Sequence, residues 1–297
     1  MNYKLKAGEQ LQERVRKILR GQMREASDLL ANAPESDAPI HGARKWLKQA
    51  RAVLRLTKPA LGEKAWRRED RRIRRIARTL AERRDAQVLR ITVKKLKDQQ
   101  TNPAVHSALA KLGRNISAGA AEAAGAPRKL RKQEAKGRAR LKSTRRRVKE
   151  LPLGQLDWPE LSRGILETYR AGAEALASAG RDRSPEELHE WRKRVKDLWY
   201  QLRVLQPIQK REMSALAEDA KQLSLRLGDD HDLFMVETAA KAAKLKPREL
   251  QLVLSFIEQG REELQDAAFK LGRQVYAEEP EIFRKRIEKR AEEWAGK

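Results

Sequence analysis

The amino-acid sequence predicts an all-α protein built of two helical bundles that are related by internal duplication. Three observations support this fold class. Charged residues make up 37% of the 297 residues, while aromatic residues make up 5%. Apolar residues recur at about the 3.6-residue period of an amphipathic helix, and the alternation typical of strands is hard to find. A basic stretch that begins near His41 occurs again near His189, displaced by 148 positions.

Composition also restricts the class of protein. The chain is long enough to bury a hydrophobic core, and zero cysteines exclude disulfides, thiolate chemistry and Cys-ligated zinc. Residues Met1–Lys6 lack the apolar region of a secretory signal, and no run approaches the roughly 18 apolar residues that span a bilayer. We therefore expect a cytoplasmic protein that does not enter a membrane.

The charge is large and unevenly distributed. The formal net charge is +25, and residues 1–150 carry 41 Lys and Arg against 15 Asp and Glu, which gives +26 for this half and −1 for the other. Such a bias causes self-repulsion, so an anionic partner is the natural explanation. The alternative is a solvated basic surface that serves only solubility.

The repeated stretch predicts two amphipathic helices, each with a cationic stripe. Its first copy is Ile40–Lys48 and its second copy is Leu188–Lys196. Successive helical residues advance by about 100°, so the basic residues of each copy fall within an arc of roughly 120°, and the opposite side is apolar. The first stripe contains His41, Arg44, Lys45, Lys48, Arg51 and Arg55, and the second contains His189, Arg192, Lys193, Lys196 and Arg203.

The first half, residues 1–150, is predicted to be a bundle of helices. Residues 128–149 contain twelve basic residues and one acidic residue, so this segment is either a helix ordered by its partner or a disordered tail; a weak apolar seam favours the helix. The spacing of apolar residues and of turn residues predicts five helices. The first three cover residues 4–31, the segment from the capping Ser36 to Lys58, and residues 62–83. A fourth runs from a break at Leu80–Asp85 to Lys97, and a fifth covers residues 104–149 with an interruption at Ser117–Pro127.

The second half, residues 151–297, follows a linker at Glu150–Pro159 and repeats the pattern. Its repeated helix opens with the capping box Ser184–Glu187. The other predicted helices cover residues 158–178, 209–227, 247–272 and 280–295. The helix over 209–227 is predicted to stop at Gly228, and a further helix is predicted to start at Asp229.

The remaining motifs favour binding over catalysis. His231 lies among Asp229, Asp230 and Asp232, which suggests either a metal site or helix capping; capping with a phosphate contact from His231 is the preferred interpretation. The sequence has no Gly-rich phosphate loop and no metal-binding His-Glu-x-x-His helix, and no nucleophile is held by a histidine and an orienting acid. We therefore expect no enzymatic activity, no cofactor and no metal.

These motifs resemble the CHAD family, named for its conserved histidines in an α-helical domain. The likeness is carried by the two His-x-x-Arg-Lys helices and by the breaks Leu80–Asp85 and Leu227–Asp232, and it covers about residues 5 to 295. The resemblance implies two four-helix bundles around a basic central groove or pore that binds inorganic polyphosphate, in a stand-alone member. Two departures are Arg84, where the family has a histidine, and Trp199, which replaces a basic residue.

The predicted function is non-enzymatic binding of inorganic polyphosphate, with association with polyphosphate granules as a further expectation. Arg forks bind phosphate oxygens in a two-pronged manner, Lys supplies a mobile charge, and nearby phosphates favour the charged form of histidine. The alternatives are a nucleic-acid-binding helical protein and a phosphohydrolase of triphosphates or polyphosphate, or its accessory subunit. Besides the two stripes, the predicted binding residues are Arg71, Arg75, Arg84, Arg131, Arg138, Arg145 and His231.

Overall fold

The structure, a computed structural model, is all-α as the sequence predicts. It describes residues 3–31, 37–80, 82–123, 127–154 and 156–296, without the side chains of 37–38, 82–86, 119–123 and 127–134. Within these ranges the chain forms twelve helices and no strand, and 86% of it is helical. The prediction of the fold class is therefore confirmed.

The helices of the first half alternate with short connections. They are α1 (Leu11–Ala31), α2 (Asp37–Leu56), α3 (Lys58–Leu61), α4 (Glu63–Thr79), α5 (Glu82–Gln99), α6 (Pro103–Ala123) and α7 (Pro127–Val148). The second half continues with α8 (Trp158–Arg181), α9 (Pro185–Leu205), α10 (Lys210–Ala242), α11 (Pro247–Val275) and α12 (Pro280–Ala295).

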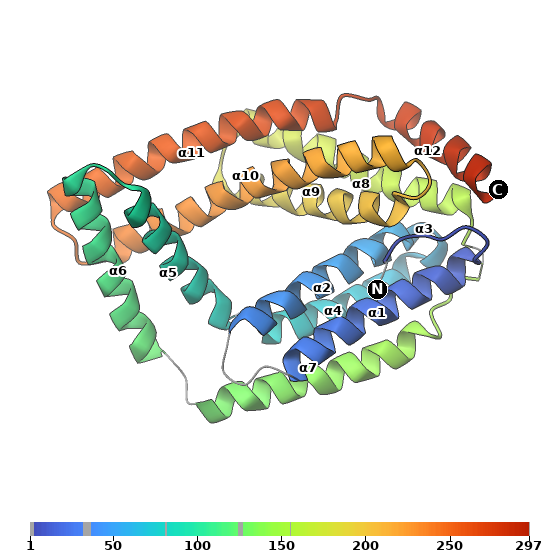
Figure 1. Ribbon diagram of the computed structural model, residues 1–297, viewed down its shortest axis with the longest axis horizontal. Helices are drawn as coiled ribbons and strands as arrows, with labels where there is room; N and C mark the ends of the chain where they lie inside the picture. The colour runs from blue at the N-terminus through green and yellow to red at the C-terminus, as the bar shows by residue number, and fades with distance from the viewer. Residues whose placement is uncertain (1–2, 32–36, 81, 124–126, 155, 297) are drawn as a thin grey trace.

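Helices α2 and α9, which carry the repeated stretch, contact each other near the middle of the molecule. Helix α1 packs against α2 and α7, while α8 packs against α9 and α12 (Figure 1). Helix α10 runs along α9 and α11, and α5 and α6 pack against α10 and α11 at the left-hand end of Figure 1. The directions of the cationic faces of α2 and α9 are thus determined by the helices that pack against their other sides.

Two hydrophobic clusters hold this arrangement together. The larger includes Leu47, Leu54, Val195 and Leu202, which are the apolar faces of α2 and α9. The smaller joins α5 and α6 to α10 and α11. Each fully buried Leu or Val stabilises the fold by about 1.5–3 kcal/mol. Both clusters contain residues from 1–150 and from 151–297, and the division into two duplicated bundles stays a prediction.

The N-terminal segment differs from the predicted helix over 4–31, because helix α1 begins only at Leu11. Gly8 has φ 71°, in the left-handed region, and so interrupts any helix that starts earlier. The buried Leu5 instead donates its backbone N–H to the Val204 carbonyl oxygen, at 2.9 Å. The segment is therefore held against the end of α9.

The predicted helix stop at Gly228 is wrong, because α10 continues from Lys210 to Ala242 without a break. Gly228 is buried, and a Cβ atom there would lie 3.1 Å from Nη2 of Arg192. The glycine therefore gives the Arg192 guanidinium room instead of ending the helix. An interior glycine costs about 1 kcal/mol relative to alanine, and the buried neighbours Leu227 and Leu233 offset that cost.

Other boundaries follow local chemistry. Helix α2 ends at Leu56, and Pro59 lies in the first turn of the short α3, where its missing N–H is tolerated. Residues Pro127–Val148 are helical, as preferred over a disordered tail, with Leu141 and Val148 buried in the main cluster. Gly164 lets α8 cross the end of α2, since a Cβ there would lie 1.8 Å from the Leu56 carbonyl oxygen.

Candidate anion-binding cavity

Helices α2, α4 and α9 line a cavity of about 650 Å³, hereafter the α2–α9 cavity. Its lining includes two carboxylates, Glu190 and Asp197, and the uncharged side chains of Trp66 and Tyr200. Cations dominate the rest of the lining. They are Arg44, Lys48, Arg51, Arg55, Arg74, Arg78, Arg192, Lys193, Arg194 and Lys196, together with the titratable His189.

The cavity brings together most of the two predicted stripes. From α2 it contains Arg44, Lys48, Arg51 and Arg55; from α9 it contains His189, Arg192, Lys193 and Lys196. The apolar faces of these helices are buried, so their cationic faces are directed away from the core and toward the shared space. Residues that are 148 positions apart in the sequence therefore line one site.

Three members of the stripes lie outside the lining. His41, Lys45 and Arg203 are exposed, and the Arg203 guanidinium lies 5.9 Å from the centroid of the Trp199 ring. Trp199, at the position equivalent to Arg51, packs against the hydrophobic core and does not line the cavity. The two helices therefore contribute different sets of residues.

Helix α4 contributes arginines that were not selected from the sequence. The predicted Arg71 and Arg75 are exposed and outside the lining, whereas Arg74 and Arg78 are part of it. The signal that could have found Arg74 is Asp70, four residues earlier, because the two side chains pair at 3.0 Å.

The other predicted residues lie elsewhere or are not described. Arg138 and Arg145 of α7 line separate cavities beside α1. The side chains of Arg84 and Arg131 fall outside the described part of the structure. His231 is outside the lining, but its ring lies 4.7 Å from that of His189, measured between centroids.

The buried Asp70 holds two of the cavity arginines. Its carboxylate accepts hydrogen bonds from Arg51 Nε at 2.7 Å and from Arg51 Nη2 at 3.4 Å. Arg74 Nε approaches the second carboxylate oxygen to 3.0 Å. Charge-assisted contacts of this kind fix the plane and direction of a guanidinium group.

Asp197 has a similar role toward Arg55, whose Nε lies 2.9 Å from a carboxylate oxygen. Burial raises the pKa of Asp197, and Arg55 opposes that shift. The Arg55 guanidinium also lies 5.4 Å from the centroid of the Trp66 ring, within cation–π range. Arg55 is therefore held from two sides.

His189 is neutral at pH 7 in the free protein. Burial, and to a smaller extent charge repulsion from His231, Lys193 and Arg192, lowers its pKa to about 4. Its Nδ1 atom is buried and has no hydrogen-bond partner within the described residues. The charged form expected from the sequence therefore requires an anion beside the ring.

The aspartates around His231 do not form a capped helix start, since they lie inside α10. Asp230 is buried and accepts hydrogen bonds from Arg261 Nε at 3.1 Å and Gln265 Nε2 at 2.9 Å. Among the residues with described positions, no group of three or more His, Cys, Asp or Glu could hold a metal ion. Asp230 therefore belongs to the packing between α10 and α11.

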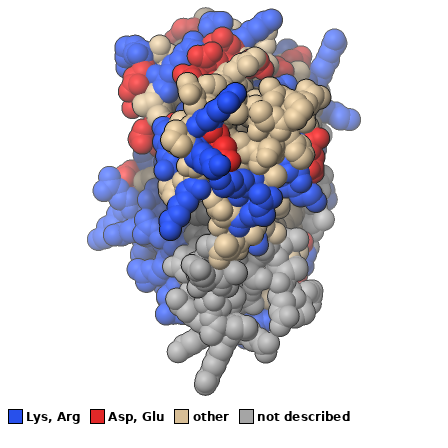
Figure 2. Space-filling view, turned by 90° about the vertical axis from the view of Figure 1, so that its left-hand side faces the viewer, with Lys and Arg blue, Asp and Glu red and all other residues tan. Residues whose placement is uncertain are grey.

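Basic side chains are not confined to the cavity. Figure 2 shows the end of the molecule formed by α5, α6 and the α10–α11 connection, where Lys and Arg lie beside Asp, Glu and uncharged side chains in the upper part. No helix in the described ranges is long and apolar enough to cross a membrane.

The fold and the cavity together define an all-α protein with paired cationic helices. The sequence model of the CHAD domain family matches residues 9–241, and the chain belongs to this family. The match is shorter than the resemblance over 5–295 and leaves α11 and α12 beyond its end. CHAD domains are associated with polyphosphate-related function. A comparison with curated proteins gave no match.

Proposed function

We propose that the α2–α9 cavity binds inorganic polyphosphate and does not hydrolyse it. One observation carries the proposal: the two copies of the repeated basic stretch line a single cavity. A flexible linear polyanion needs positive charge along a path and no base-specific contacts, and this lining offers cations from three helices with few acids.

The geometry supports a preorganised binding surface. Asp70 and Asp197 contact the arginines Arg51, Arg74 and Arg55, which restricts their motion before a ligand arrives. Such guanidinium groups can each take two phosphate oxygens. Lys48 and Lys196, at equivalent positions of the two helices, supply mobile charges that can follow an irregular phosphate chain.

The carboxylates of the cavity support binding without catalysis. Glu190 pairs with Lys193 at 2.9 Å and with Arg194 at 2.5 Å, and Asp197 pairs with Arg55. Each is engaged by a cation, and so neither is placed as a metal ligand or as a general base for water. The proposal includes a cytoplasmic location, in keeping with zero cysteines, and association with polyphosphate granules.

Charge reversal on equivalent lysines tests the site. The variant Lys48→Glu/Lys196→Glu should abolish polyphosphate binding, measured by isothermal titration calorimetry. Its matched control, Lys45→Glu/Arg203→Glu, changes the same charge on the same two helices outside the lining. The control should keep most of the affinity because distant exposed charges are screened by salt. Equal losses in both variants would mean that overall charge, and not the cavity, determines binding.

Two assays separate the proposal from its alternatives. Fluorescent polyphosphate should be displaced more readily by unlabelled polyphosphate than by duplex DNA or RNA; the opposite order would favour a nucleic-acid-binding protein. Incubation with Mg²⁺ and polyphosphate should release no phosphate and should not shorten the chain. Either product would establish an enzyme.

A further inference from the structure

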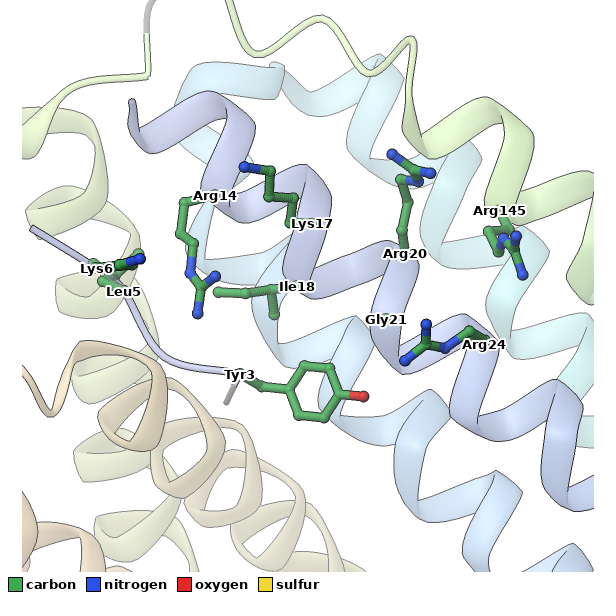
Figure 3. A pocket seen from close by; sticks show the side chains of 10 residues that line it. All are labelled: Tyr3, Leu5, Lys6, Arg14, Lys17, Ile18, Arg20, Gly21, Arg24 and Arg145. Atoms are coloured by element: carbon green, nitrogen blue, oxygen red, sulfur yellow. The ribbon is translucent and has the colours of Figure 1, made fainter. Parts of the chain in front are cut away.

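A second basic cavity, of about 640 Å³, lies between the N-terminal segment, α1 and α7. It shares no lining residue with the α2–α9 cavity. No Asp or Glu of the described residues lines it, and Figure 3 shows its cations along α1, on α7 and, for Lys6, on the N-terminal segment. They are Lys6, Arg14, Lys17, Arg20, Arg24 and Arg145.

Local structure fixes this cavity. Lys17, Arg20 and Arg24 are spaced three and four residues apart, so they project from one side of α1. The Tyr3 ring packs edge-on against Trp46, with centroids 4.9 Å apart, and the backbone of Leu5 is bonded to Val204. The N-terminal segment therefore forms a fixed wall of the cavity.

A neighbouring cavity of about 520 Å³ extends the basic surface along α7. The two cavities share Arg20 and Arg145 and are therefore adjacent, and no acidic residue of the described part of the chain lines the second one. Together they form an elongated surface, hereafter the α1–α7 track. The cations that the second cavity adds are Arg138, Lys142, Arg146 and Lys149.

Arg20 and Arg145, at the junction, differ from three neighbouring cations of α1 that are paired with carboxylates. Arg14 and Lys17 pair with Glu9, and Arg24 lies 3.6 Å from Glu25. Arg20 Nε is buried and has no hydrogen-bond partner among the described residues. Nor does any described carboxylate pair with Arg145. Two guanidinium groups that pair with no carboxylate of the described residues, and that line the same cavities, are the arrangement expected where an external anion binds.

We propose that the α1–α7 track binds a second segment of a linear phosphate polyanion, separate from the segment in the α2–α9 cavity. The identity of the ligand rests on the proposed function, whereas the site rests on its own geometry. Concave spaces of this volume admit a thin chain. A single-stranded nucleic acid would require aromatic rings for base stacking. Among the described lining residues Tyr3 alone is aromatic, and its ring is packed against Trp46.

The test uses tripolyphosphate and long-chain polyphosphate as probes in isothermal titration calorimetry. Arg20→Gln/Arg145→Gln should bind one tripolyphosphate fewer per protein and should bind the long chain roughly tenfold more weakly. A matched control is Arg211→Gln/Arg226→Gln, which removes the same charge from exposed positions of α10. This control should behave as wild type. Circular dichroism should show unchanged helical content in both variants.

The outcomes distinguish the two sites. Unchanged stoichiometry and affinity in Arg20→Gln/Arg145→Gln would overturn the track. A loss of DNA affinity without loss of polyphosphate affinity would also overturn it, since the ligand would then be a nucleic acid. If Lys48→Glu/Lys196→Glu binds polyphosphate normally while Arg20→Gln/Arg145→Gln does not, the track stands and the function proposed for the α2–α9 cavity fails.

Discussion

Replacing Asp70 by Asn should lower stability and raise polyphosphate affinity at the same time. Asp70 lies behind the cavity and neutralises part of the charge of Arg51 and Arg74. The substitution keeps the size of the side chain and one acceptor oxygen but removes the negative charge. The folded protein loses a favourable pairing, whereas an incoming polyanion gains a more positive site.

The magnitude follows from the burial of the three side chains. The Asp70 side chain is 6% exposed, while those of Arg51 and Arg74 are 27% and 50% exposed. A hydrogen bond to a charged group contributes about 1.5–3 kcal/mol, but an exposed partner recovers much of this through water. We therefore expect a loss of about 1–3 kcal/mol in the free energy of unfolding, or about 2–6 °C in Tm.

The effect on binding has the opposite sign. One carboxylate roughly 10 Å from several phosphates, screened by solvent and salt, should change the affinity about two- to fivefold. Isothermal titration calorimetry at two ionic strengths measures this gain, which should shrink at the higher salt concentration. Thermal unfolding gives Tm for the same samples.

The control for this variant is Asp219→Asn, which removes the same charge from an exposed position of α10. It should change the free energy of unfolding by no more than about 0.5 kcal/mol. The reasoning would be refuted if Asp70→Asn bound polyphosphate more weakly than wild type. In that case the orientation of Arg51 and Arg74 by a full negative charge would outweigh the electrostatic gain.

Two further predictions concern His189 and Gly228. The pKa of His189 is about 4 in the folded protein and about 6.5 in an unfolded chain. Between these pH values the unfolded state binds more protons than the folded state. The free energy of unfolding therefore falls as the pH falls from about 6.5 to 4. Thermal unfolding should show a shallower fall in His189→Gln but not in His106→Gln, and identical slopes would exclude a neutral His189. Gly228→Ala should displace the Arg192 guanidinium and weaken polyphosphate binding by roughly two- to tenfold without lowering Tm, since alanine favours a helix by about 1 kcal/mol. Gly113→Ala, where the nearest side-chain atom is 3.6 Å from the added Cβ, should retain wild-type affinity; an equal loss there would remove Arg192 from the explanation.

The cationic face of each copy of the repeated stretch could be predicted, because helical periodicity fixes which residues share a face. Once Leu47 and Val195 are buried, Arg44, Lys48 and Lys196 must lie away from the core. Which residues along each cationic face line the cavity was less predictable. His41, near the start of α2, is exposed and outside the lining, although His189 at the equivalent position lines the cavity.

Helix α4 shows why the rest of the site could not be predicted. The apolar Ile73 and Ile76 mark its buried face, but arginines flank that face on both sides. Which flank is directed at the cavity depends on packing against α2, and there the buried Asp70 pairs with both Arg51 and Arg74. The Asp70–Arg74 pair has helical spacing, but the Asp70–Arg51 pair joins two helices and leaves no periodic signal in a sequence.

Gly228 shows a second limit of sequence reasoning. A glycine followed by three acidic residues and a histidine is typical of a helix end and a new start. The same glycine is equally suited to the interior of a helix where another side chain approaches closely. Only the position of Arg192 on α9 distinguishes the two possibilities.

The charge distribution along the chain bears on the two proposed sites together. The α2–α9 cavity takes cations from both halves, with Lys48 and Lys196 as equivalent members. It therefore cannot explain why residues 1–150 carry a net +26 while residues 151–297 carry −1. The α1–α7 track takes all of its cations from residues 1–150, and no acid of the described residues lines it. A polyanion that occupied the α2–α9 cavity alone would leave much of this self-repulsion uncompensated, whereas a second segment on the track would offset it within the basic half.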